Sequence, residues 1–142
     1  LTGCEICQEV CPKNQGLTPR RHYPIEIEKK SDSPELIPLL LGDENYCRTA
    51  LPSFALWLAN DFSTLRRNVA LALGNICDPA AVPALIQVLS YSKPKVRSYA
   101  AWALGRIGGR KAREALARRL NSEVNSEVQK EIKAALQECS KA

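Results

Sequence analysis

A recurrence of 31 residues constrains the fold of this chain more than any other feature. The tripeptide Ala72-Leu73-Gly74 returns as Ala103-Leu104-Gly105, 31 positions later, and Ala135-Leu136 follows after about the same interval without a glycine. Each copy lies in an apolar pattern of helical period, and the first two copies are followed by a second such pattern. A unit of two helices cannot bury its apolar side alone, so neighbouring units must stack. We therefore expect an all-α solenoid.

The helices of these units are expected over residues 65–77, 80–91, 95–109, 110–122 and 127–139. Asp78-Pro79 is typical of a helix start, with an N-cap and then proline at the first helical position. Gly108-Gly109 is expected to break the helix between Arg106 and Arg110, and Ser126-x-x-Gln129 reads as a capping box. Gly74 and Gly105 lie late in their helices, which indicates a close approach of a neighbouring helix.

Two stretches carry a resemblance to the HEAT-like repeat family, in the short-unit form also called phycobilisome-lyase-type. They are LRRNVALALGNICDPAAVPALIQVL and KVRSYAAWALGRIGGRKAREALARRL. The resemblance implies the solenoid fold but says little about function, because such repeats serve as scaffolds for many partners.

Three cysteines are crowded near the start of the chain, in GCEICQEVCP. Cys4, Cys7 and Cys11, with Pro12 after the last, match the end of the bacterial ferredoxin run Cys-x2-Cys-x2-Cys-x3-Cys-Pro, which holds [4Fe–4S] clusters. The position of the first cysteine of that run is occupied by Leu1. A zinc site with His22 or Cys47 as fourth ligand, or a remnant that binds no metal, are the alternatives.

Composition divides the chain into three zones. Residues 1–34 are a partial ferredoxin-like motif and linker with irregular structure, residues 35–62 hold two leading helices on either side of Gly42-Asp43, and residues 63–142 hold the repeats.

The other cysteines, Cys47, Cys77 and Cys139, are scattered through helical pattern and are expected to be free thiols. There is no apolar run long enough for a membrane span, so we expect a cytoplasmic protein. The start at Leu1 and the lack of methionine suggest a piece of a longer chain.

Positive charge is concentrated in the last third of the chain. Residues 1–92 carry eight Lys and Arg against ten Asp and Glu, whereas residues 93–142 carry twelve against five. Clustered cations favour a polyanionic partner, above all a nucleic acid, although a solvated basic surface is an equally good reading. The candidates for phosphate contact are Arg66, Arg67, Lys93, Lys95, Arg97, Arg106, Arg110, Lys111, Arg113, Arg118 and Arg119.

Two tryptophans and two glutamates have alternative roles in packing or binding. Trp57 and Trp102 lie in apolar helical pattern and are expected in the core, and stacking on RNA bases is the alternative. Glu114 and Glu131 are expected to pair with neighbouring cations, Arg118 and Lys130 respectively. No catalytic constellation of side chains is evident, so we predict no catalytic residues.

The cysteine motif and the repeats together resemble the carboxy-terminal part of the epoxyqueuosine reductases. The stretches that carry this resemblance are GCEICQEVCPKN and RRNVALALGN. The family is cobalamin-dependent, carries two [4Fe–4S] clusters, and reduces the epoxide of epoxyqueuosine in tRNA at the end of queuosine biosynthesis. The resemblance implies that Cys4 and Cys7 ligate one cluster and Cys11 the other, and that the repeats dock tRNA.

The resemblance also implies what this chain lacks. The cobalamin-binding catalytic domain and the remaining cluster ligands would lie upstream, so the chain alone is expected to be inactive although its parent is an oxidoreductase. The stretch ALPSFALWLANDFSTLRRN lacks the Lys and Arg expected before the repeat signature, which leaves a related reductase of another substrate open. The alternative function is a protein-interaction scaffold of another iron–sulfur oxidoreductase, with the basic third meeting an acidic protein.

Overall fold

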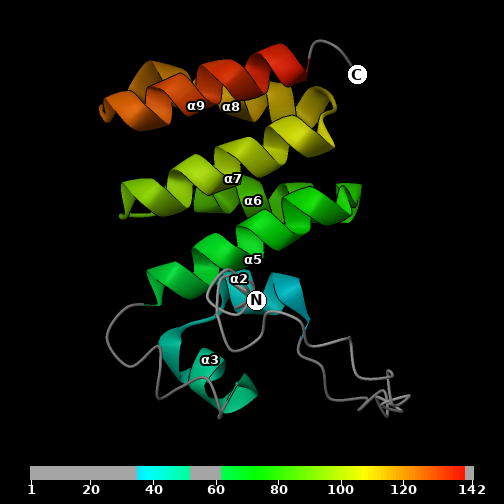
Figure 1. Ribbon diagram of the computed structural model, residues 1–142, viewed down its shortest axis with the longest axis vertical. Coiled ribbons are helices and arrows are strands. Elements are labelled where there is room, and N and C mark those ends of the chain that lie inside the picture. The colour runs from blue at the N-terminus through cyan, green and yellow to red at the C-terminus, as the bar shows by residue number, and fades with distance from the viewer. Residues whose placement is uncertain (1–34, 52–61, 140–142) are drawn as a thin grey trace, which may run out of the picture. The chain divides into compact units, whose positions relative to one another are not determined.

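The computed structural model describes residues 35–51 and 62–139, and every regular element in these ranges is helical (Figure 1). The elements are α2 (Leu36–Leu41), α3 (Glu44–Ala50), α5 (Ser63–Ile76), the 3₁₀ turn η1 (Pro79–Ala81), α6 (Val82–Val88), α7 (Pro94–Ile107), α8 (Arg110–Ser122) and α9 (Ser126–Glu138). The expected all-α solenoid is confirmed.

The helices are arranged in two layers. Helices α5, α7 and α9 lie one above another, and α6 and α8 lie behind them (Figure 1). Each pair, α5 with α6 and α7 with α8, is one repeat unit, and α9 begins the next. The short helix α2 packs on the first unit, against both α5 and α6. From α5 to α9, every second α-helix therefore lies in the same layer.

The core runs without interruption between the two layers. Leu65, Leu85, Leu104, Leu116 and Ile132 are each 1% exposed or less, and they come from five successive long helices. Full burial of such a side chain contributes about 1.5–3 kcal/mol. Because each helix buries its apolar side against the next unit, the stack is stabilised mainly by contacts between neighbours.

The repeated glycines lie where helices of the same layer touch. A Cβ built on Gly105 would come within 2.8 Å of both Cα and Cβ of Ala135 on α9. A Cβ on Gly74 would lie 2.9 Å from Cα of Ala103 on α7. Real side chains do not approach backbone that closely, so the close approach predicted from the repeat is confirmed.

Two of the three helix-end signals predicted from the sequence are confirmed. The carboxylate of Asp78 accepts a hydrogen bond from the backbone N–H of Ala80, at 2.9 Å, and caps η1, which leads into α6. Gly108 and Gly109 have φ values of +73° and +90° and separate α7 from α8, as predicted. The expected cap at Ser126 is wrong, because Asn125 caps α9 and accepts hydrogen bonds from the N–H groups of residues 127 and 128.

The leading region is helical on both sides of its predicted turn. Helix α2 ends just before Gly42, and α3 begins after Asp43, whose carboxylate caps it by accepting from the N–H of Tyr46 at 2.7 Å. Residues 1–34, with the cysteine motif, and residues 52–61, with Trp57, lie outside the described ranges. Within those ranges, no helix has the length and apolar character that crossing a membrane requires.

Candidate nucleic-acid interface

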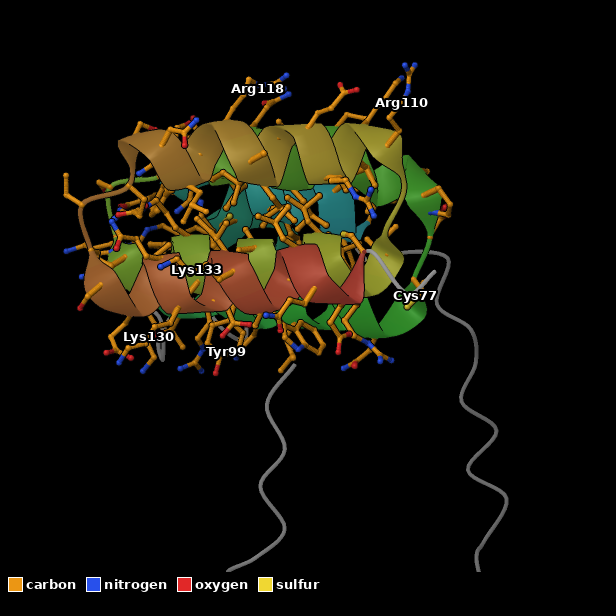
Figure 2. All side chains as sticks on the ribbon, turned by 90° about the horizontal axis from the view of Figure 1, so that it is seen from above. Cys77, Tyr99, Arg110, Arg118, Lys130 and Lys133 are labelled. Carbon is orange, nitrogen blue, oxygen red and sulfur yellow. The ribbon has the colours of Figure 1, made fainter. Side chains whose placement is uncertain are left out.

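The predicted phosphate-binding cations do not form one surface. Arg110 and Arg118 project from α8 on one side of the stack, whereas Tyr99 and Lys130 lie on the opposite side, on the layer of α5, α7 and α9 (Figure 2). Other members of the predicted set lie inside the molecule. The solenoid therefore sorts these side chains into separate environments, each of which has a different use.

Arg66 is internal. Its side chain donates one hydrogen bond to the carbonyl of Gly42, at 2.6 Å, and another to the hydroxyl of Tyr91, at 3.0 Å. The guanidinium also lies over the Tyr91 ring, 5.0 Å from its centre. Arg66 is only 8% exposed, so it connects the α2–α3 turn to the α6–α7 turn and is not available to phosphate.

Arg97 is also internal, where it forms a fork-to-fork pair with Glu123. Its Nε and Nη2 atoms donate to the two carboxylate oxygens at 2.8 and 2.7 Å, while Nη1 donates to the carbonyls of Tyr91 and Ser92. Arg119 donates to the same carboxylate at 3.0 and 2.7 Å. Arg97 is 6% exposed and donates to four acceptors inside the fold, so its predicted contact with RNA stays a prediction that the structure does not favour.

Glu123 is the centre of this network. Its hydrogen bonds from Arg97, helped by one from the N–H of Asn125 and by Arg119, lower the pKa of its carboxyl from 4.5 to about 2, although burial opposes the shift. The carboxylate also accepts from the N–H of Val124. A single buried anion thus fixes the turn between α8 and α9 and holds two arginines in place.

Three exposed cations lie on α8, and we call them the α8 cation surface: Arg110, Lys111 and Arg118. Arg110 is 87% exposed at its side chain and meets Glu114 only at 3.9 Å. Among the described residues, Lys111 and Arg118 have no ion-pair partner. The predicted pair of Glu114 with Arg118 is wrong, since Glu114 faces Arg110. A groove of about 220 Å³ between α6 and α8 adjoins this surface and is lined by Arg118 and Arg119.

The remaining predicted cations lie elsewhere. Arg113 is exposed on α8, but it donates to the carbonyl of Cys139 at the end of α9, at 2.9 Å. Arg67 donates to the side chain of Asn68 and lies over the ring of Tyr99, 5.8 Å from its centre. Lys93 and Lys95 are exposed at the start of α7, and Arg106 is exposed at its end.

The described part of the chain offers no metal centre. Cys4, Cys7 and Cys11 lie outside it, and within it no group of three His, Cys, Asp or Glu side chains could hold an ion. Cys47 and Cys139 are buried free thiols and Cys77 is an exposed one, which confirms the prediction for these three.

The structure also shows a groove on the opposite layer that the sequence did not indicate. It is centred on Trp102, which is half-buried and not fully enclosed, and on Glu131, which does not pair with Lys130 as predicted. Lys130 pairs instead with Glu127, at 3.0 Å. The groove joins side chains from α5, α7 and α9, so no local sequence signal could have revealed it.

Comparison with known proteins matches the architecture. A family model described as HEAT repeats matches residues 51–137. The epoxyqueuosine reductase of Bacillus cereus is 34% identical over 139 residues, which are 96% of this chain and 36% of that protein. The epoxyqueuosine reductase of Listeria monocytogenes is 36% identical over 136 residues, which are 94% and 35% of the two chains.

A solved structure shows the same similarity in three dimensions. It is a crystal structure of epoxyqueuosine reductase with an epoxyqueuosine-modified stem loop of tRNA-Tyr, and it matches with a TM-score of 0.66 at 29% identity over 97% of this chain and 37% of that one. This chain thus spans a little over a third of the length of these relatives. The chain belongs to the HEAT-repeat family, and over most of its length it is similar to the epoxyqueuosine reductases.

Proposed function

We propose that this chain is the tRNA-docking repeat region of an epoxyqueuosine-reductase-like protein. Two observations support the proposal. Its similarity to such reductases covers 96% of the chain, and one solved relative holds a tRNA stem loop. The conclusion for this chain depends above all on the α8 cation surface, because it presents three positive side chains that the fold does not need for its own packing.

The α8 cation surface is suited to a phosphate backbone. Arg110 and Arg118 carry planar guanidinium groups that can donate two parallel hydrogen bonds to a phosphate, and Lys111 adds a flexible ammonium on the same helix. Only Glu114 opposes them among the charged groups exposed on α8, so the surface is strongly positive. Cations of this kind release counterions when they meet phosphates, which makes the binding depend on salt.

The cysteine motif gives the parent protein its redox character in this proposal. If the motif follows the two-cluster ferredoxins that it resembles, Cys4 and Cys7 would hold one [4Fe–4S] cluster and Cys11, as the last cysteine of the run, would hold the other. Further cysteines and the cobalamin site would come from an upstream catalytic domain. The clusters supply electrons when bound, whereas the described helices of this chain would bind and orient RNA. We expect no epoxide reduction by the chain alone.

The test is fluorescence anisotropy with a labelled anticodon stem loop of a queuosine-accepting tRNA and with an unrelated stem loop. Titrations at several salt concentrations give the slope of log K against log salt. The double charge reversal Arg110→Glu with Arg118→Glu should lower the affinity and reduce the magnitude of that slope by about 2, roughly 1 for each lost phosphate contact.

The matched control is Lys130→Glu with Lys133→Glu on α9, which changes the net charge by the same amount. Lys130 lies on the opposite side of the stack from Arg110 and Arg118 (Figure 2). An equal loss in both double variants would mean a non-specific charge effect and would contradict the α8 cation surface as the docking site. Lack of any binding at low salt would favour the alternative, a scaffold whose basic surface meets an acidic protein.

A further inference from the structure

The layer of α5, α7 and α9 carries a groove that RNA docking on α8 leaves unused. Two adjoining hollows of about 310 and 290 Å³ share Trp102 and Glu131 in their walls. The first is also lined by Leu71, Ser98 and Tyr99. We call the two hollows together the Trp102 groove. Its wall combines aromatic rings, an exposed aliphatic side chain and a carboxylate.

The aromatic part of the groove is built into the fold. The indole of Trp102 lies against α5 where the chain has glycine, since a Cβ on Gly74 would be only 2.5 Å from its Cζ3 atom. The neighbouring Tyr99 already has the guanidinium of Arg67 over its ring. The position of the Trp102 ring is thus set by its packing against α5. The contact between Arg67 and Tyr99 shows that a guanidinium can lie over an aromatic ring of this layer.

The acidic part of the groove has no partner of its own. Glu131 is half-buried on α9 and forms no ion pair or hydrogen bond within the described ranges. Burial raises the pKa of its carboxyl, and no neighbouring cation offsets this effect. A carboxylate that is partly removed from water without a partner is unfavourable in the free protein, and a bound cation would compensate it.

The other charged groups of the groove are few. Arg106 and Glu138 line the second hollow together with Glu131, so two carboxylates face one guanidinium there. The first hollow has Glu131 as its charged lining residue. Arg67 lies over the ring of Tyr99, which lines the first hollow, so the nearby cations balance the carboxylates in number, and it is the unpaired carboxylate of Glu131 that favours a bound cation. Figure 2 shows Tyr99 on the side opposite Arg110 and Arg118, so RNA on α8 would not cover the groove.

The geometry points to a docking site for a protein partner that inserts an arginine side chain, flanked by apolar residues, into the Trp102 groove. The planar guanidinium stacks on Trp102 while its N–H groups donate to the carboxylate of Glu131. The flanking apolar residue packs on Leu71, which is 37% exposed on the wall of the first hollow. The solenoid thus binds two partners of opposite charge on opposite sides.

The site is tested with a capped Leu-Arg-Leu tripeptide as the probe and the ¹⁵N-labelled chain as the target. The tripeptide with citrulline in place of arginine has the same shape without the charge. NMR titration should shift the indole N–H of Trp102 and the amides of Leu71 and Ser98 with the arginine peptide. The citrulline peptide should bind at least about tenfold more weakly, because charge-assisted hydrogen bonds to Glu131 are lost.

The decisive variant is Glu131→Gln, which keeps the shape of the side chain and should weaken the arginine peptide about tenfold. Glu114→Gln removes one exposed carboxylate from α8 and should leave peptide affinity unchanged. The site is overturned if the groove amides do not shift, if both peptides bind equally, or if Glu131→Gln has no effect. Displacement of the peptide by a tRNA stem loop would also overturn it, because the groove would then belong to the RNA surface.

Discussion

Arginines that look alike in the sequence have opposite roles in the folded chain. Arg97 is 6% exposed and has its donors occupied by Glu123 and by two carbonyls, whereas the side chain of Arg110 is 87% exposed. The buried arginine stabilises a turn and the exposed one is free to meet a ligand. Charge counts along the sequence treat both equally, so the basic third of the chain overstates the cations that a partner can reach.

The buried ion pair of Arg97 and Glu123 is expected to contribute strongly to the stability of the fold. Glu123→Gln removes the anion but leaves Arg97 buried, so the free energy of unfolding should fall by about 3–5 kcal/mol. Urea unfolding followed by far-UV circular dichroism measures this change. Glu114→Gln, at an exposed pair with 3.9 Å between its charged atoms, should change the stability by less than about 0.5 kcal/mol.

The same carboxylate sets a pH dependence. The folded state holds the pKa of Glu123 at about 2, against 4.5 for the ordinary group, so the unfolded chain binds this proton more readily. The stabilisation from Glu123 is therefore present above pH 4.5 and is lost as the pH falls toward 2. Glu123→Gln should remove this part of the acid sensitivity, and an unchanged pH profile would contradict the assignment.

The packing of whole helices depends on small residues at their crossing points. Ala135 of α9 comes so close to Gly105 of α7 that an added Cβ would lie 2.8 Å from its Cα atom. Both partners of that clash are helix backbone, which cannot move without shifting a helix. The repeat of glycine at this place is therefore a packing requirement and not a local conformational one.

Gly105→Ala should therefore destabilise the packing of α7 against α9. Alanine favours a helix by about 1 kcal/mol relative to glycine, yet the forced separation of α7 and α9 should cost more, with a net loss of about 1–3 kcal/mol. Thermal unfolding measures the net change. Asn121→Ala, on the exposed side of α8, should instead be neutral or stabilising. A stabilising Gly105→Ala would show that the helices can separate freely.

Helices α5 to α9 form a stack in which each repeat unit is covered by the next. Helix α9 covers α7 and contributes Val128, Ile132 and Ala135 to the common core. A chain that ends after residue 125 keeps Glu123 but loses this cover. Its free energy of unfolding should fall by about 3–6 kcal/mol, from the loss of two large buried side chains, and its urea m-value should fall because less surface is buried.

The control for this truncation is a chain that ends after Cys139, which keeps all of α9. It should unfold at the same urea concentration as the full chain. If the chain that ends after residue 125 also had the same urea midpoint as the full chain, the stability of the stack would not depend on contacts between neighbouring units.

The repeat period predicted the fold class and the glycines where helices touch, and capping residues and glycines predicted several of the helix bounds. These features are local, because Asp78 caps its own turn, Gly108-Gly109 takes backbone angles that other residues avoid, and a 31-residue period already implies stacking. The spacing of the cysteine motif matches the end of a ferredoxin run, and its metal content stays a prediction.

Tertiary structure alone decided which side chains a partner can reach. Arg97 meets Glu123 across 26 positions of sequence, and Arg66 meets Gly42 across 24, so their burial depends on how the units stack. The Trp102 groove joins residues of three helices for the same reason. Contacts between residues distant in sequence carry no local signal, and those contacts assign each cation and carboxylate of this chain to packing or to binding.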